Sequence, residues 1–356
     1  MPAAPLAELV PGTRTPSGPG GLWRYRACIP VGDDIAARLT LGEGHTPIVS
    51  AGSDLEGVTL KLEFVFPTLS FKDRGAVVLI ASAVERGARR VVADSSGNAG
   101  SAIAAYAARA GLECQVFVPA AISARKRAQI LAYGASLECV AGDRTAAAEA
   151  AIAAVARTGA TYASHIYNPY FLQGTKTFAF ELWEQLGRGV PDAVIVPAGN
   201  GTLALGAARG FGELQAAGLI ERVPALIALQ SERCAPLAQA WTMGLREPVD
   251  VEVTPTSAEG IAIPRPARGA QILAAVAHSG GCVVSVPEVA IEPAQRDLAA
   301  RGLFVEPTAA LVWAGLLIAR HHPAVRGIAV ESEGWTVARA LTRGNVAVPL
   351  CGSGLK

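Results

Sequence analysis

The chain has 356 residues, and its 31 Lys and Arg against 30 Asp and Glu give a formal net charge of +1. This balance lacks the excess positive charge that attracts nucleic acids or anionic membrane surfaces, so neither is expected as a partner. The length and a hydrophobic content of 51% predict one large or two closely joined domains with a substantial core. A small molecule is therefore the expected ligand.

The sequence indicates no membrane span, secretory signal, disulfide framework or metal site. The apolar run 311–319 is about half of a membrane span, and residues 1–21 lack the basic and apolar regions of a secretory signal, which favours a cytoplasmic protein. Six scattered cysteines show neither metal-ligand spacing nor a disulfide framework. His321-His322 follows a helical run without partners at ligand spacing and is interpreted as a solvated helix end. No metal site is predicted.

From about Val58 onward, short β-rich runs alternate with Ala-rich helical stretches. This alternation is typical of βαβ units around parallel sheets, so the fold class is α/β with two open-sheet α/β domains. The larger domain is predicted at residues 1–79 and 178–356, and a smaller inserted domain at 80–177. Ligands of such sheets bind beyond the carboxyl ends of strands. The predicted strands are 91–94, 115–119, 137–141, 193–197, 226–230 and 328–331.

The first candidate motif is P-T-L-S-F-K-D-R-G at residues 67–75, in which Lys72 lies in a turn just before a helical pattern begins at Ala76. A helix amino terminus disfavours a nearby cation, and loss of hydration lowers the pKa of a lysine. Both effects favour the neutral amine that Schiff-base formation requires. A solvated lysine balanced by Asp73 is the alternative interpretation.

The second motif, D-S-S-G-N-A-G at residues 94–100, lies between a predicted strand and the helical run 102–110. Its small residues allow an anion to approach the free N–H groups of the helix start. The carboxylate of an amino-acid substrate fits there, and Asn98 can donate a hydrogen bond to a cofactor oxygen. An ordinary Ser-rich helix cap is the alternative.

The third motif, P-A-G-N-G-T-L at residues 197–203, again joins a strand to a helix through glycines. Glycines permit close approach, and the helix start with the Thr202 hydroxyl supplies donors for a phosphate. The motif lacks the P-loop lysine and the dinucleotide G-x-G-x-x-G pattern, so a small phosphorylated cofactor is the better match than a nucleotide. A fourth segment, L-C-G-S-G at 350–354, closes an apolar run.

In this order, S-F-K-D-R-G, S-S-G-N-A-G, G-N-G-T and C-G-S-G-L-K resemble the fold-type II pyridoxal-phosphate enzymes, the tryptophan synthase β-like superfamily. The resemblance covers nearly the whole chain after Leu41. The segments 41–47, 66–75, 168–170 and 304–310 look most like threonine synthases. The resemblance implies a pyridoxal 5'-phosphate enzyme that is usually a homodimer.

The resemblance also implies individual roles. Lys72 is the Schiff-base lysine and proton carrier, and Ser96 is a second acid/base. Three residues contact the cofactor ring: Phe71 against its face, Asn98 at its phenolic oxygen and Cys351 beside its pyridine nitrogen. The substrate carboxylate is received by Ser95, Gly97, Asn98 and Ala99, and the cofactor phosphate by Gly199, Asn200, Gly201, Thr202 and Leu203.

Three positions depart from the threonine synthase pattern. The segment H-I-Y-N-P-Y-F at 165–171 usually reads N-S-V-N-P-Y-R, so Phe171 stands where an arginine suits a phosphate dianion. Leu69 replaces a glycine, and Cys351 replaces a threonine, as in many serine and threonine dehydratases. The segment 256–266 also looks like a dehydratase segment, with Glu259 at its acidic position.

Two reactions therefore remain open. One is conversion of O-phosphohomoserine to threonine, and the other is β-elimination from serine or threonine, or β-replacement on an activated serine. Both begin with deprotonation of the substrate Cα by Lys72. A neutral thiol at the ring nitrogen makes a milder electron sink, which suits elimination. A pyridoxal-phosphate-binding or amino-acid-sensing protein without turnover is the alternative that is not an enzyme.

Overall fold

The computed structural model describes residues 20–95, 97–120, 124–328, 330 and 332–356. The chain folds into two compact units. Unit 1 contains Thr46–Phe64 and Phe178–Leu355, and unit 2 contains the described part of Pro2–His45 together with Val65–Thr177 and Lys356. Within the described residues, no helix combines the length and apolarity needed to cross a bilayer.

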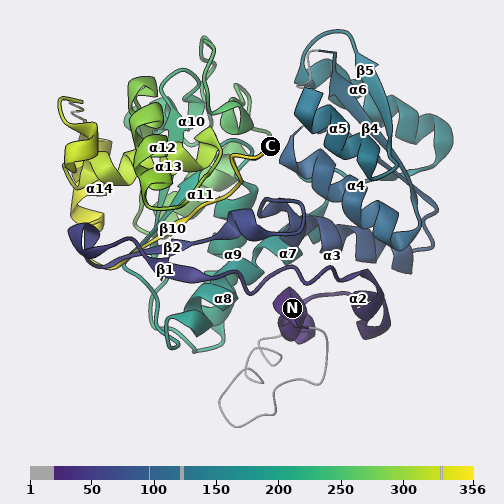
Figure 1. The fold of residues 1–356 in the computed structure, drawn as a ribbon, viewed down its shortest axis with the longest axis horizontal. Coiled ribbons are helices and arrows are strands. Elements are labelled where there is room, and N and C mark those ends of the chain that lie inside the picture. The colour runs from purple at the N-terminus through teal and green to yellow at the C-terminus, as the bar shows by residue number, and fades with distance from the viewer. Residues whose placement is uncertain (1–19, 96, 121–123, 329, 331) are drawn as a thin grey trace. The chain divides into compact units, whose positions relative to one another are not determined.

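Unit 1 is built on a six-stranded sheet with the order β1-β2-β10-β7-β8-β9. The neighbouring strands β1, β2 and β10 are labelled in Figure 1. Only the edge pair β1 and β2 is antiparallel, so β2, β10, β7, β8 and β9 end at the same edge of the sheet. The bounds are β1 Ile48–Ser50, β2 Val58–Lys61, β7 Ala193–Pro197, β8 Ala225–Ser231, β9 Cys282–Val286 and β10 Val346–Pro349.

The helices of unit 1 bury the apolar faces of this sheet. α13 is buried along nearly its whole length and packs against β7, β8, β9 and β10, which explains its uniformly apolar sequence. The bounds are α8 Thr177–Gln185, α9 Thr202–Ala216, α10 Pro236–Thr242, α11 Gly269–His278, α12 Ile291–Ala300, α13 Pro307–Ala319 and α14 Glu333–Leu341, with short 3-10 turns at Ser53–Leu55, Glu259–Ile261, Glu288–Ala290 and Pro323–Val325.

Unit 2 contains a fully parallel four-stranded sheet with the order β5-β4-β3-β6. Helix α3 packs on α4 and α7 beside it. The bounds are α2 Asp33–Leu39, α3 Lys72–Glu85, β3 Arg90–Ala93, α4 Asn98–Ala110, β4 Glu113–Pro119, α5 Ala124–Ala132, β5 Ser136–Val140, α6 Arg144–Thr158, β6 Thr161–Tyr162 and α7 Pro169–Thr175, with a 3-10 turn at Gly21–Cys28. A further 3-10 turn, Glu63–Val65, spans the point where the chain passes from unit 1 to unit 2.

Local sequence explains where these helices begin and end. The Asp143 side chain accepts hydrogen bonds from the backbone N–H of Thr145 at 2.9 Å and of Ala146 at 3.0 Å, which fixes the start of α6. Gly111 and Gly159 end α4 and α6 in the left-handed conformation, with φ of 68° and 67°. These caps agree with the α/β alternation in the sequence.

The predicted α/β fold class is confirmed, and five of the six predicted strands are present to within two residues at each end. The run 328–331 is different, because residues 329 and 331 lie outside the described residues and Ile328 and Val330 are not in a strand. Two helix starts were placed too late. α3 begins at Lys72 rather than Ala76, and α4 at Asn98 rather than Ala102, because each turn motif continues directly into its helix. The predicted domain limits stay a prediction.

A buried ionic cluster lies at the carboxyl end of β2 in unit 1. Lys61 Nζ lies 3.0 Å from Glu181 Oε2 and 3.9 Å from Glu63 Oε1, and all three side chains are fully buried. The ammonium also donates to the Thr46 carbonyl at 3.0 Å and to Gln185 Oε1 at 2.9 Å. These hydrogen bonds offset part of the cost of burying the charges.

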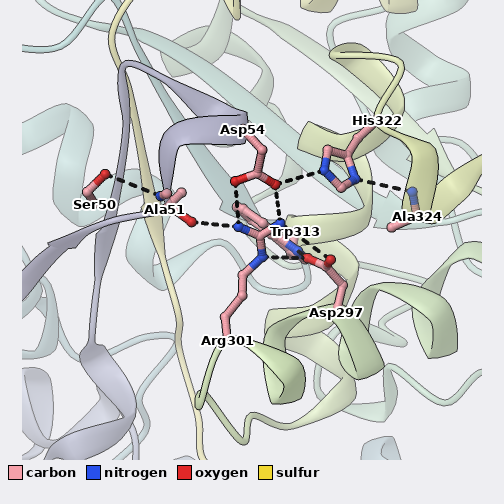
Figure 2. A network of polar contacts seen from close by, with 9 residues as sticks. Ser50, Ala51, Asp54, Asp297, Arg301, Trp313, His322 and Ala324 are labelled. Carbon is pink, nitrogen blue, oxygen red and sulfur yellow. Dashed lines mark hydrogen bonds and ion pairs between the residues drawn. The ribbon is translucent and has the colours of Figure 1, made fainter.

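A second polar network links four segments of unit 1 (Figure 2). Arg301 donates two hydrogen bonds to the Asp54 carboxylate, at 3.0 and 2.6 Å, and a third to Asp297 Oδ2 at 2.8 Å. His322 Nε2 lies 3.0 Å from Asp54 Oδ2, and Trp313 Nε1 donates to Asp297 at 2.8 Å. The interpretation of His322 as a solvated helix end was therefore wrong, because its ring is held by Asp54 and by the Ala324 N–H.

The Asp54 carboxylate predicts an acid-sensitive contribution to stability. Hydrogen bonds from Arg301 and His322 hold its pKa well below the usual value. A carboxylate with a lowered folded-state pKa stabilises above its unfolded pKa of 3.8, and this stabilisation is lost as the pH falls. We expect Asp54→Asn to lower the Tm at pH 7 and to differ progressively less from the wild type below about pH 4.

The measurement is thermal unfolding of both proteins from pH 7 to pH 3. Arg296→Gln is the matched control, because Arg296 pairs with Glu292 in an exposed i,i+4 contact of α12 and should change the Tm little. A Tm difference for Asp54→Asn that is constant across this range would contradict the assigned role of the Asp54 charge.

Candidate active site

The predicted site residues fall into two groups, each within one compact unit. Lys72 and the segment 95–99 belong to unit 2, whereas the loop 199–203 and Cys351 belong to unit 1. Each group follows the carboxyl end of a parallel strand or begins a helix, as the βαβ pattern requires. Ser96, the predicted second acid/base, lies outside the described residues.

The turn before Lys72 is closed by the buried Asp73 carboxylate. The Thr68 N–H donates to Asp73 Oδ2 at 2.8 Å, and the Thr68 hydroxyl donates to Asp73 Oδ1. Burial raises the pKa of Asp73 to about 7. Leu69, within this turn, has a left-handed φ of 65°, a conformation that costs a non-glycine residue about 1 kcal/mol. The residue that replaces the usual glycine of the motif is thus strained.

Lys72 is the first residue of α3, and aromatic rings surround its amine. Its Nζ lies 4.2 Å from the ring centroid of Phe71 and 5.9 Å from that of Phe171. Phe171 is fully buried against α3, where a Cβ on Gly75 would come within 2.4 Å of its ring. Two aromatic rings therefore lie beside the Lys72 amine, and the contact of Phe71 with the cofactor ring stays a prediction.

Sequence reasoning missed His165 as a neighbour of Lys72. The His165 ring lies 5.9 Å from the Phe171 ring, centroid to centroid, with an interplanar angle of 68°. Burial and the positive charge of Lys72 lower the pKa of His165 well below its usual value, so the imidazole is neutral near pH 7. Its position just after β6, at the carboxyl edge of the sheet, was the available signal.

The segment 95–99 forms the passage from β3 into α4. Gly97 is the residue before the helix and caps it without a side chain, so the first N–H groups of α4 carry no side-chain cap. A Cβ on Gly100 would lie 1.8 Å from the Ser95 carbonyl oxygen, so the loop packs directly on the helix. Ser95, Asn98 and the buried Ala99 lie around this turn, as an anion site at a helix start requires.

Asp94, at the beginning of this segment, was not singled out from the sequence. Burial raises its pKa, and Tyr162 on the neighbouring strand β6 interacts with it. An acidic residue directly before a loop of small polar residues could have indicated this contact. The pair lies directly before the loop that is predicted to receive the substrate carboxylate.

In unit 1, the loop 199–203 leads from β7 into α9. A Cβ on Gly199 would lie 2.9 Å from Ile261 Cα, and Gly201 has a φ of 67° that favours glycine. Gly201 precedes α9 without a side-chain cap, and Thr202 is the first helical residue. The helix start therefore presents backbone N–H groups and a hydroxyl, which are the donors that a phosphate needs.

Gln230 supports this loop and was also missed. Its fully buried side chain donates from Nε2 to the Ala198 carbonyl at 2.9 Å. Its Oε1 accepts hydrogen bonds from the N–H groups of Leu237 at 2.8 Å and Ala238 at 3.1 Å, at the start of α10. One amide thus fixes the loop before Gly199 to a second helix. A glutamine at the end of the buried strand A-L-I-A-L-Q-S was the sequence signal.

Cys351 lies at the same sheet edge as the loop 199–203. β10 runs parallel to β7 with Val346 opposite Ala193, and Cys351 follows the last residue of β10 by two positions. The thiol is buried, and its Sγ lies 3.5 Å from the Pro349 carbonyl oxygen. Within unit 1, the residues predicted to hold a phosphate and a ring nitrogen therefore share one edge.

The family model described as pyridoxal-phosphate dependent enzyme matches residues 39–330. The chain belongs to this family. A threonine synthase from Mycobacterium leprae is 36% identical over 344 residues, covering 95% of this chain and 89% of the relative. A threonine synthase from Methanocaldococcus jannaschii is 34% identical over 303 residues, covering 83% of this chain and 74% of the relative.

Solved structures give the same fold. A threonine deaminase from T.th. matches with a TM-score of 0.67 and 27% identity, covering 83% of this chain and 87% of that one. A maize serine racemase matches with a TM-score of 0.73 and 22% identity, covering 91% and 92%. The tryptophan synthase β-like fold, the pyridoxal phosphate cofactor and the assignment as an enzyme are thereby confirmed.

The Gln230 contacts predict that cofactor affinity depends on a residue outside the loop. Gln230→Leu removes the bond to Ala198 and leaves two N–H groups of α10 without their acceptor, which loosens the loop. We expect the Kd for pyridoxal phosphate to rise by about 10-fold or more, since a lost buried hydrogen bond costs about 1–3 kcal/mol.

The Kd is measured by titrating cofactor-free protein and following absorbance. Gln215→Leu is the control, because Gln215 lies on α9 with its amide bonded only to the exposed Glu221 carbonyl. An unchanged Kd for Gln230→Leu would show that Gln230 does not contribute to cofactor binding.

Proposed function

We propose that Lys72 is the residue that binds pyridoxal phosphate covalently and that takes and returns the Cα proton of a small amino-acid substrate. The position of Lys72 at the first residue of α3, with its amine beside Phe71, carries this proposal. Bound there, the cofactor supplies an electron sink for the bond broken at Cα. Lys72 holds the proton within reach of that atom.

The remaining roles follow the same assignment. We assign the cofactor phosphate to residues 199–203 and the ring nitrogen to Cys351. Ser95, Gly97 and Ala99 orient the substrate carboxylate, Asn98 donates to the cofactor oxygen, and Ser96 is the second proton carrier. The uncapped start of α9 fits a phosphate. Among the described residues, the buried Ser70 hydroxyl, two positions before Lys72, lacks a hydrogen-bond partner and is available to a ligand.

The first candidate reaction is conversion of O-phosphohomoserine and water to threonine and phosphate, and the curated relatives are named threonine synthases. Identities of 34–36% over most of the chain support it. The second candidate is β-elimination from serine or threonine, or β-replacement on an activated serine. Elimination breaks Cα–H and Cβ–O, and hydrolysis then gives a 2-oxo acid and ammonia. The buried Phe171 and Cys351 favour the second candidate.

Assembly, location and domain limits complete the proposal. We propose a cytoplasmic homodimer, as is usual for enzymes that resemble this chain, and a larger domain at 1–79 and 178–356 with 80–177 inserted. The balanced charge and the small-residue loops at the strand ends support a small amino acid as the binding partner.

The Lys72 assignment predicts a specific loss. Lys72→Ala should abolish the absorbance band of the lysine-bound cofactor and lower kcat by about 100- to 10 000-fold, the usual contribution of a proton-transferring side chain. Lys126→Ala, on α5 of the same unit, is the control. A Lys72→Ala protein with the wild-type band and rate would refute the assignment.

The same preparations distinguish the two reactions. Incubation with O-phosphohomoserine, serine, threonine and O-acetylserine is followed by assays for phosphate, threonine, ammonia and 2-oxo acids. Phosphate and threonine from O-phosphohomoserine identify the first candidate. Ammonia and a 2-oxo acid from serine or threonine identify the second.

A further inference from the structure

The side chains beside the Lys72 amine influence which leaving group the substrate can carry. This inference rests on the proposed function, because it takes Lys72 as the amine that exchanges the Cα proton. Such an amine must come within hydrogen-bond reach of Cα, so residues about 6 Å from its Nζ face the atoms next to Cα. Phe171, at 5.9 Å from Nζ, is such a residue, and His165 packs edge-on against it.

Neither ring can balance a phosphate dianion. Phe171 carries no charge and is fully buried, and its ring packs so closely on α3 that a Cβ on Gly75 would come within 2.4 Å of it. Burial and the nearby charge of Lys72 lower the pKa of His165, so its imidazole is neutral near pH 7 before a ligand binds. A dianion placed here would lose hydration without gaining the bidentate partner that a guanidinium provides.

The other cation that acts on His165 is Arg144. It is the first residue of α6, its side chain is exposed, and it lowers the pKa of His165 less than burial and Lys72 do. An exposed arginine is hydrated and screened by salt, so it is a weaker partner for a buried anion than an arginine within the site. The Arg144→Ala variant distinguishes its contribution from that of the two rings.

We propose that His165 and Phe171 determine the substrate class, by forming an uncharged aromatic wall that admits a small amino acid with a neutral leaving group and disfavours a phosphorylated one. A hydroxyl or acetoxy group is uncharged and can lie against these two rings. When such a group leaves, it takes the electron pair of the Cβ–O bond, as acetate from O-acetylserine or, after gaining a proton, as water from serine.

The test compares O-acetylserine with O-phosphoserine, which share the serine skeleton and differ in the charge of the leaving group. Each is titrated into the wild-type holoenzyme, and the shift of the cofactor absorbance band gives its half-saturating concentration. O-Phosphohomoserine is titrated in the same way. We expect O-acetylserine to bind at least about 100-fold more tightly than either phosphorylated compound, since an unpaired charge is costly to bury.

A cation introduced into the wall should weaken this preference. His165→Arg places a guanidinium beside Phe171, at a position where the side chain keeps some exposure to solvent. We expect His165→Arg to bind O-phosphoserine at least about 10-fold more tightly than the wild type and to be competed by inorganic phosphate. His165→Gln, which stays neutral, is the matched control and should keep the wild-type preference.

Two results would overturn the inference in different ways. Tighter binding of O-phosphoserine or O-phosphohomoserine by the wild type, lost in Arg144→Ala, would show that Arg144 grips phosphate, and the function of Lys72 would stand. Absence of any band shift with every amino acid would refute the proposed function and the inference with it.

Discussion

The buried Asp73 carboxylate fixes the turn from which Lys72 starts α3, and the position of the reactive amine depends on it. Two hydrogen bonds from Thr68 satisfy this carboxylate. They compensate only part of the lost hydration, and the pKa of Asp73 rises to about 7. The turn also keeps Leu69 in a left-handed conformation. Unfavourable burial and backbone strain are thus concentrated within four residues of Lys72, as is common at functional sites.

The same physical solution recurs at the two other motifs. A parallel strand ends, a short loop of small residues turns, and a helix begins without a side-chain cap, which leaves backbone N–H groups for an anion. Gly100 and Gly199 are required because a Cβ would collide with backbone atoms of Ser95 and Ile261. The Gln230 side chain fixes the loop 199–203 through its hydrogen bond to the Ala198 carbonyl. Small residues leave space for a ligand at these loops, and buried polar groups fix the loop conformation.

Sequence alone predicted the α/β class and five strands, because periodicity encodes them. It could not predict the Phe171 ring beside Lys72 or the hydrogen bond from Gln230 to Ala198, because these contacts join residues 99 and 32 positions apart. Both depend on how the elements pack. The start of α3 was misplaced because a cation such as Lys72 is disfavoured at a helix amino terminus. His322 was misjudged because its partner Asp54 is 268 residues away.

We propose that Lys72, and no other lysine of the chain, carries the cofactor. Reduction of the holoenzyme with borohydride converts the bond between a lysine and pyridoxal phosphate into a stable amine, and peptide mass spectrometry then locates it. The account predicts that the modified peptide contains Lys72, with Lys61, Lys126, Lys176 and Lys356 unmodified. Stoichiometric modification at any of those four lysines, with Lys72 free, would contradict it.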